Sequence, residues 1–481
     1  SLPATGQSNK FKRLYSNSSG GEWAISALNF DDSTFLLNGF CITDSARGLW
    51  MMKIGSDGTL LDSRVFAKPL TIFLGASAGS LVRVGDHYYV GAGDQYPNPN
   101  IPNEYYGMPY IVKLESNGLD TVWTKRLIND TNKYYLPASF KVTGDHHLLL
   151  AGAVCKPYVT PGIFDYFLIK ADTNGNVLWE KKYGVNNLDE RCNNVEVDYD
   201  STILLTGMKY SSGKYRPWII RVDKNGNNPQ YKQYTIPSMQ HAGVDVKKRA
   251  GGGYYMTGFT DSLLQAGDDP ETMYLGRLDS NLNIVWRTFV NSPYLTQIWD
   301  FFERENGSVV FCGDRKDSVT GKPYGYIAKA DSNGNLLWWQ TYHEYPQRVN
   351  YLSCVRPTAD GGIIACGSAF DTLTGQNQNA WVIKTDSMGC ALTQCVTSVA
   401  DAHPFAEKVM IYPNPAKDRF RLSCGTGTLI TVYTLSGSRV YQQVINTGNE
   451  EISTEGWVRG IYLVRLQMKG GGFITERLLV E

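Results

Sequence analysis

Short apolar segments of about four to eight residues, separated by turn-forming residues, fill most of positions 1–395. One pattern recurs seven times: an aromatic residue, two mostly apolar residues and a Lys or Arg, followed in most copies by an acidic residue and a turn. The copies begin at Trp50, Tyr110, Phe167, Trp218, Tyr274, Tyr326 and Trp381. They lie about 50 to 60 residues apart, which indicates a repeat protein built from small supersecondary units.

Further strands flank each copy of the pattern. An apolar strand that ends in glycine precedes it, and in most copies a Trp-bearing strand such as VLWEKKY or LLWWQTY follows it. The glycines are Gly39, Gly91, Gly152, Gly207, Gly258, Gly313 and Gly367. Each unit is therefore interpreted as four short strands, A to D, and repeated four-stranded units are typical of propeller blades. The sequence predicts an all-β, seven-bladed β-propeller in which the strand C aromatic wedges between neighbouring blades.

The turns between strands C and D carry Asn-Gly in sequences such as TNGN and SNGN. For such tight hairpins we expect both central residues to take positive φ. The alternating Asp and Asn also look like the start of a calcium loop. These turns run directly into a strand and have no distant glutamate or following helix, so we expect no metal there.

The two ends of the repeat region complement each other. The seventh copy has strands A, B and C, but the segment after it, SMGCALTQC, lacks the usual Trp strand. The early segment FKRLY aligns with VLWEKKY, so that Phe11 matches Trp179 and Tyr15 matches Tyr183. We expect residues 11–15 to supply strand D of the last blade, because this pairing removes an open sheet edge.

The repeat ends near residue 395, and residues 396–408 have the small side chains and proline of a linker. Residues 409–481 predict a second all-β domain, for which a small immunoglobulin-like sandwich fits. The motif Tyr412, Pro413, Asn414, Pro415, followed by TVYTLSGSRV, GIYLVRL and the terminal ERLLV, resembles the type A C-terminal sorting domain of type IX secretion substrates.

The resemblance implies export across the outer membrane of a Gram-negative bacterium, with the type IX secretion machinery as the partner of this domain. It also implies that the tail is usually removed and that the cargo is often tethered to surface lipopolysaccharide. Cleavage is expected in the exposed linker at 396–408. The alternative from the residues alone is a plain accessory sandwich domain.

Composition excludes several classes of partner. Lys plus Arg number 46 and Asp plus Glu number 46, so no net field favours nucleic acid. No apolar run is long enough to span a membrane.

Residues 1–10 are polar, so we expect a mature form without its export signal. Among nine cysteines, only Cys390 and Cys395 are close in sequence, and they form either a local disulfide or two buried thiols. We expect no cofactor.

Two groups of residues are candidates for ligand binding on the propeller. The long loop from Asp94 to Met108 between strands B and C holds Tyr96, Tyr105 and Tyr106, and tyrosines on a stiff loop make good contacts. The starts of the A strands are expected to face the channel mouth. They carry Trp23, Arg191, His241, Trp299 and Arg348, which would suit a sugar or an acidic ligand. For both groups the alternative is ordinary packing.

The function of the propeller stays open between two classes. One is a surface binding or adhesion module for glycan or protein, and the other is an extracellular glycan-cleaving lyase or hydrolase. The enzyme requires an acid and base pair or a metal beside one pocket. No such pair is evident in the sequence, since the paired Asp268 and Asp269 fall in a predicted loop. The sequence therefore favours the binding module, with no catalytic residue assigned.

Overall fold

The computed structural model describes residues 9–481, except 18–20, 43–46, 67–71, 76–79, 98–104, 131, 156–162, 186–187, 199, 235–238, 263–270, 291–295, 317–321, 345–348, 372–376, 392–409, 424–427, 435–437, 446–448 and 468–472. The chain divides into two compact units, Ser1–Ser398 and Val399–Glu481. The described residues contain no helix that is long and apolar enough to cross a membrane.

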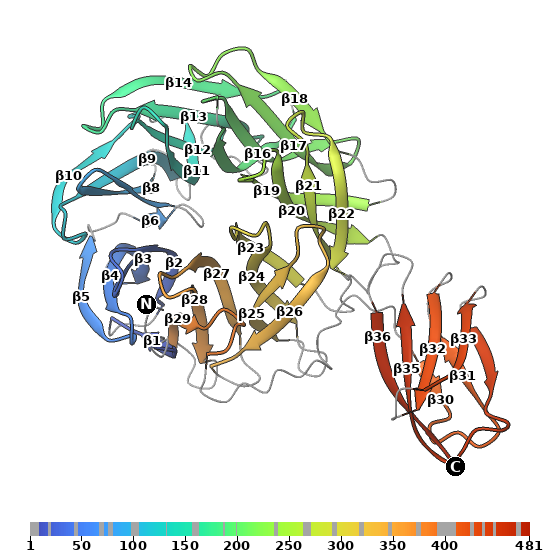
Figure 1. Cartoon of the computed structure of the whole chain (residues 1–481). Coiled ribbons are helices and arrows are strands. Elements are labelled where there is room, and N and C mark those ends of the chain that lie inside the picture. The colour runs from blue at the N-terminus through green and yellow to red at the C-terminus, as the bar shows by residue number, and fades with distance from the viewer. Residues whose placement is uncertain are drawn as a thin grey trace. The chain divides into compact units, whose positions relative to one another are not determined.

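The first unit is a ring of antiparallel blades (Figure 1). They are four-stranded, except that strand A of blade 2 is divided into two short strands, and a parallel pair between Tyr134 and Gly107 joins blades 2 and 3 into one nine-stranded sheet. The first four blades follow the chain in order. Blade 1 contains β2 (Trp23–Asn29), β3 (Thr34–Ile42), β4 (Arg47–Gly55) and β5 (Leu60–Phe66). Blade 2 contains β6 (Ile72–Gly75) with β7 (Leu81–Val84), then β8 (His87–Pro97), β9 (Tyr105–Leu114) and β10 (Thr121–Arg126). Blade 3 contains β11 (Tyr134–Val142), β12 (Leu148–Cys155), β13 (Asp165–Ala171) and β14 (Val177–Tyr183), and blade 4 contains β15 (Glu190–Val197), β16 (Ile203–Ser211), β17 (Lys214–Val222) and β18 (Gln230–Gln233).

Three more blades complete the ring. Blade 5 is β19 (Met239–Lys248), β20 (Tyr254–Ser262), β21 (Glu271–Leu278) and β22 (Ile284–Val290); blade 6 is β23 (Thr296–Glu303), β24 (Val309–Lys316), β25 (Pro323–Ala330) and β26 (Leu336–Tyr342); blade 7 is β27 (Asn350–Pro357), β28 (Ile363–Asp371), β29 (Asn377–Thr385) and β1 (Phe11–Tyr15). The prediction of a seven-bladed propeller is confirmed.

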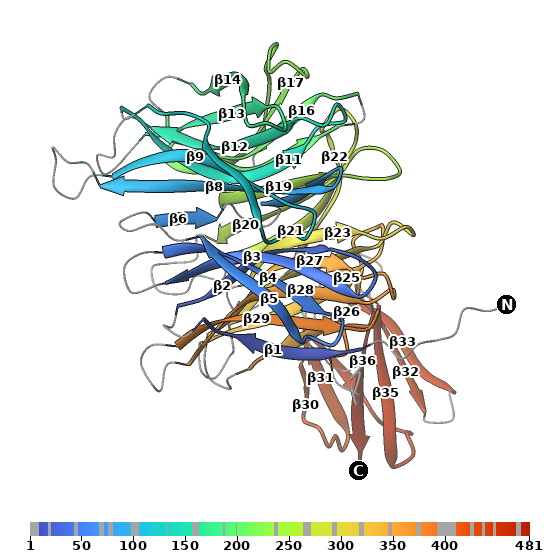
Figure 2. The same ribbon diagram turned by 90° about the vertical axis from the view of Figure 1, so that its left-hand side faces the viewer.

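Blade 7 is closed by the N-terminal strand. β1 pairs antiparallel with β29, with Leu14 opposite Trp381, and Figures 1 and 2 both show the two strands side by side. This is the pairing expected from the match between FKRLY and VLWEKKY. Because strand D of the last blade comes from the other end of the repeat region, the sheet of blade 7 joins both ends of the propeller.

Strand D of one blade packs on the C–D turn of the next by a contact that is repeated around the ring. A tyrosine at the end of strand D donates its hydroxyl hydrogen to a main-chain carbonyl in that turn. Tyr15 donates to Gly58 at 2.6 Å, Tyr183 to Gly226 at 2.8 Å and Tyr234 to Leu282 at 2.7 Å, and Tyr342 donates to Gly389. The N-terminal strand therefore joins blade 7 to blade 1 as other D strands join their neighbours.

The aromatic residue near the start of strand D covers the same turn. A Cβ at Gly58 would be 2.7 Å from the Phe11 ring, and one at Gly226 would be 3.1 Å from the Trp179 ring. At the interface of blades 7 and 1, Phe11 thus occupies the place that Trp179 has at the interface of blades 3 and 4. This explains why most D strands carry a Trp and why the next turn carries a glycine.

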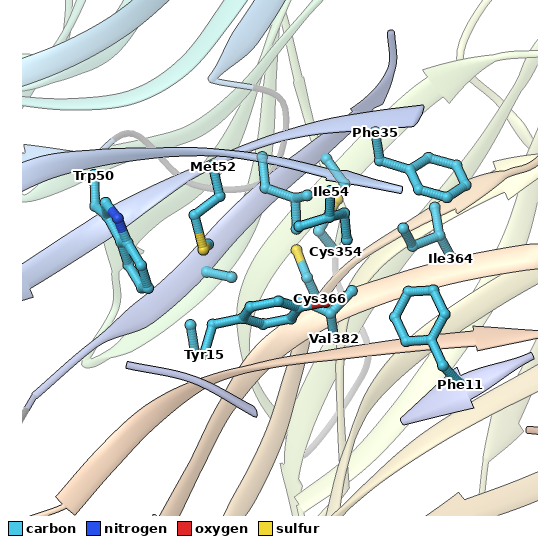
Figure 3. Packing of buried hydrophobic residues seen from close by; sticks show 14 of the residues in the cluster. Phe11, Tyr15, Phe35, Trp50, Met52, Ile54, Cys354, Ile364, Cys366 and Val382 are labelled. Carbon is cyan, nitrogen blue, oxygen red and sulfur yellow. The ribbon is translucent and has the colours of Figure 1, made fainter. Parts of the chain in front are cut away.

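The strand C aromatics wedge between blades, as expected. Trp50 of blade 1 packs with Cys354, Cys366 and Val382 of blade 7 in a buried cluster (Figure 3). Trp381 of blade 7 in turn packs with side chains of blade 6. Among the described residues, buried apolar clusters span six of the interfaces between neighbouring blades, and burial of this surface stabilises the ring.

The glycine at the end of strand B sits opposite a β-bulge in strand A. In blade 6, Ile298 is opposite Gly313 and Asp300 is opposite Cys312, which leaves Trp299 as the extra residue. A Cβ at Gly313 would lie 1.7 Å from the carbonyl oxygen of Gln297. Only glycine fits there, because the bulge brings the strand A backbone against strand B.

The expectation for the C–D turns is wrong in one detail. Gly175 has φ of 75°, but Asn174 before it does not have positive φ. Asp172 accepts the backbone N–H groups of Asn174 and Asn176, both at 2.8 Å. The aspartate thus closes the turn with its own carboxylate, and only the glycine needs the left-handed conformation.

The second unit is a two-sheet β-sandwich, as predicted. One sheet contains β30 (Met410–Tyr412), β31 (Arg419–Ser423) and β34 (Asn449–Ser453). The other contains β33 (Arg439–Ile445), β32 (Thr428–Thr434), β35 (Gly460–Gln467) and β36 (Phe473–Val480). Phe420, Val432, Val464 and Leu478 belong to the buried core between them.

Candidate functional site

Trp299 is the residue in the bulge of strand A in blade 6. Its side chain is 48% exposed, although most tryptophans of the described propeller are buried or half-buried. The indole Nε1–H donates to Oδ1 of Asp314, a buried residue on the adjacent strand β24. The hydrogen bond fixes the orientation of an indole that stays open to solvent.

The other blades use the bulge differently. Where a single extra residue is described, it is Ile25, Ala138, Asn193 or Ser353. These side chains are small, polar or, for Ile25, buried. Because a bulge redirects the side chain that it carries, blade 6 uses a shared backbone feature to present a large aromatic surface.

Four half-buried aromatic residues lie on blades 7 and 1. The rings of Trp23 and Tyr351 stack with centroids 6.3 Å apart and an interplanar angle of 17°. Phe40 lies 5.7 Å from Trp23, and Phe370 lies 6.1 Å from Tyr351. All four are at the strand A starts and strand B ends, the same end of the blades as Trp299.

Asp314, the partner of Trp299, also acts electrostatically on Tyr351. Burial raises the pKa of Tyr351, and the negative charge of Asp314 raises it further. We call Trp299, Tyr351, Trp23, Phe40 and Phe370 the aromatic arc. It runs over blades 6, 7 and 1 and contains two of the five residues predicted at the starts of the A strands.

Arg191 belongs to a separate cluster on blade 4. Its Nε lies 3.2 Å from Oδ2 of Asp189, and its guanidinium carbon lies 5.2 Å from the centre of the Phe164 ring. The hydroxyl of Tyr215 donates to the same Asp189 oxygen at 2.6 Å. The charge of Arg191 is therefore already paired within its own blade and its neighbour.

Two further predicted residues are only partly described. His241 lies in β19 opposite Thr260, but its side chain is outside the described part of the structure. Arg348 falls within 345–348, outside the described residues. Their expected position at the channel mouth stays a prediction.

The three tyrosines lie on a long hairpin, where the sequence suggested a loop. β8 extends to Pro97 and β9 begins at Tyr105, with Tyr96 opposite Tyr106. Only residues 98–104 separate the two strands, and they lie outside the described residues. Of the three side chains only that of Tyr106 is described, and it is half-buried.

One acidic residue has an unusual pKa. Glu190 at the start of β15 is fully buried, and desolvation raises its pKa from 4.5 to about 7 despite Lys209 at 3.6 Å. It accepts the backbone N–H of Val185 at 3.2 Å. Glu22 binds the N–H of Asn17 in blade 1 in the same way, at 3.0 Å. Glu190 therefore clamps the D–A connection and is shielded from any substrate.

Buried charges among the A strands neutralise one another. Asp300 binds Lys247 of blade 5 and Arg356 of blade 7, and it accepts the N–H of Val355 at 3.0 Å. The two cations hold the pKa of Asp300 low against its burial. This triad ties three blades together and leaves no acid or base free for catalysis within it.

The described side chains offer neither a metal site nor a disulfide. No group of three or more His, Cys, Asp or Glu side chains suited to a metal ion occurs in the part of the chain that the structure describes. Cys390 is buried, but Cys395 lies outside the described residues, so both alternatives for this pair, a local disulfide or two buried thiols, stay open. A cavity of about 350 Å³ lies at the opposite ends of the A strands, where Lys141 and Glu196 face each other at 3.7 Å.

In the second unit the motif at 412–415 lies beside the last strand. Asn414 accepts the backbone N–H of Leu479 at 2.9 Å and donates its side-chain N–H to the carbonyl of Arg477 at 2.7 Å. Tyr412 is 47% exposed. The motif is therefore part of the folded sandwich, held against β36.

Comparisons with known proteins separate the two units. Residues 410–481 match the family model of the secretion system C-terminal sorting domain. No curated protein matches the sequence. One solved structure that resembles the chain is PorZ, an essential bacterial surface component of the type IX secretion system of Porphyromonas gingivalis. The two share 12% sequence identity and a TM-score of 0.36, and the match covers 94% of this chain and 69% of that chain.

Two other structures also resemble the chain. The polysaccharide lyase Uly1 has 8% identity, with 80% of this chain and 95% of that chain covered and a TM-score of 0.47. The propeller domain of the Trilobed protease from Pyrococcus furiosus has 9% identity, with 79% and 96% covered and a TM-score of 0.39. At such identities and TM-scores, these structures do not indicate what this chain binds or does. Residues 410–481 belong to the secretion system C-terminal sorting domain family, and the chain is a type IX secretion substrate, a β-propeller exported to the surface of a Gram-negative bacterium or beyond it.

Proposed function

We propose that the propeller is a binding module for an extended polysaccharide, with Trp299 as its central contact. The observation that carries the proposal is the exposed indole in the bulge of blade 6, fixed by Asp314. A partner that covers an exposed tryptophan removes apolar surface from water, which is favourable, and the rigid side chain loses little entropy on binding. The face of a sugar ring presents C–H groups that suit the negative face of an indole.

The aromatic arc supports a ligand that is longer than a single sugar. Trp23 and Tyr351 form a second stacked surface on the two blades that follow Trp299 around the ring. Tyr351 has a hydroxyl for a polar contact, whereas the Nε1 of Trp23 is buried, so Trp23 contributes the face of its ring. A chain of several sugars can contact both surfaces.

The test compares Trp299→Ala with Tyr210→Ala. Tyr210 is also an exposed aromatic residue, at 40%, but it lies on blade 4, away from the arc. Affinity electrophoresis in gels containing neutral glucan, mannan or xylan, or acidic pectin or alginate, identifies a polysaccharide that retards the parent protein. Trp299→Ala should weaken its binding by about 10- to 100-fold, as for an aromatic anchor, and Tyr210→Ala should leave it unchanged.

Equal retardation of both variants would exclude Trp299 as the contact. Release of reducing ends or of unsaturated uronates from the same polysaccharides would instead favour the glycan-cleaving enzyme. If none of these polysaccharides retards the parent protein, the result would favour a protein ligand instead.

A further inference from the structure

The sorting motif forms the outer edge of the sheet that contains the terminal strand. β36 pairs with β35 on one side. On its other side, Asn414 binds the N–H of Leu479 and the carbonyl of Arg477. The backbone then continues the pairing, since Ala416 N–H donates to Leu479 and Glu481 N–H donates to Ala416, both at 2.8 Å. The motif thus covers an edge that would otherwise be open.

These contacts define the register of the terminal strand. Leu478 and Val480 point into the core, whereas Arg477 and Leu479 are exposed. A slip by one residue would exchange the two sets and bury Arg477. Asn414 uses both ends of its amide on main-chain groups two residues apart, so a slip by one residue would break both hydrogen bonds.

The register places an apolar pair on the outer face of the sheet. Leu479 is 38% exposed, and Ile461, its partner on β35, is 46% exposed. We propose that this pair is the centre of the surface that the secretion machinery contacts, and that Asn414 is a positioning residue that presents it. The machinery is the occupant because the sorting-domain match covers the motif and both strands and ends with the chain.

The experiment uses three variants of the full chain, produced in a bacterium with type IX secretion. Asn414→Ala removes the clamp, Leu479→Ser changes the outward side chain but keeps the backbone contacts, and Arg419→Ala is the control. Arg419 pairs with Glu451 at 2.7 Å on the other sheet, where both are exposed. Cell fractionation measures export, and hydrogen exchange on purified protein measures the amides of Leu479 and Glu481.

Asn414→Ala should raise the exchange rate at Leu479 on the order of tenfold and lower export. Leu479→Ser should lower export with unchanged exchange at Glu481, and Arg419→Ala should change neither. Normal export of Leu479→Ser would refute the surface. Lost export of Asn414→Ala without faster exchange would show that the machinery contacts Asn414 itself. Faster exchange with normal export would show that the secretion machinery does not depend on the register of the terminal strand.

Discussion

Replacing Gly58 by alanine should loosen the contact that closes the propeller ring. Gly58 is buried in the C–D turn of blade 1, with φ of 80°. A Cβ there would come within 2.7 Å of the Phe11 ring and 2.9 Å of Cδ of Arg13, both on β1. The closing strand must therefore shift, whereas the rest of blade 1 is untouched.

A matched control separates this effect from backbone strain. Gly361 has φ of 79°, and a Cβ there would meet nothing within 4 Å. Alanine in this left-handed conformation costs about 1–2 kcal/mol at either position. Overpacking adds about 1–3 kcal/mol at Gly58 alone. Gly58→Ala should thus destabilise the propeller by about 1–3 kcal/mol more than Gly361→Ala.

Urea unfolding followed by tryptophan fluorescence measures the free energy of unfolding of the propeller in both variants. Hydrogen exchange of residues 12–15 locates the change, and it should accelerate only in Gly58→Ala. Equal losses of stability in the two variants, or unchanged exchange in β1, would refute the view that this strand closes the ring through Gly58.

Three further predictions concern stability. Tyr183→Phe removes one buried hydrogen bond to Gly226 and should lower the free energy of unfolding by about 1 kcal/mol in urea titrations. The raised pKa of Glu190 means that the folded state holds its proton more tightly, so stability falls as pH rises from 4.5 to about 7. Between pH 4.5 and 8, Glu190→Gln should therefore gain up to about 3 kcal/mol relative to the parent in calorimetry, and a constant difference would contradict this. Calcium or EDTA should leave the melting temperature unchanged, because Asp172 is already bound by its own turn.

The blades and their closure could be predicted because they are repeated in the sequence. Seven copies of the strand C pattern gave the number of blades, and the match of Phe11 and Tyr15 with Trp179 and Tyr183 indicated the strand that joins the ends. These residues make the same contacts in the structure. Internal repeats act as an alignment within one chain, so equivalent positions share their physical role.

The features that depend on main-chain pairing could not be predicted. The sequence places Trp299 at the start of a strand, but only the register shows that it is the extra residue in a bulge. The pattern likewise predicted a loop at Tyr96 and Tyr106, where the strands continue as a hairpin. The motif at Asn414 was recognisable by resemblance, yet its hydrogen bonds to a strand more than sixty residues later have no local signal.

The distribution of repeated and varied residues around each blade is consistent with a ligand site on one end of the propeller. The contacts between blades that recur with the same residue types lie at the C–D turns and at strands B and C. At the starts of the A strands the residue in the bulge varies from Ser353 to Trp299. A substitution there leaves the turn contacts of Tyr183 and its equivalents in place, so this end can acquire a binding surface at little cost in stability. Trp299 illustrates this, since its only described polar contact is with Asp314 of its own blade.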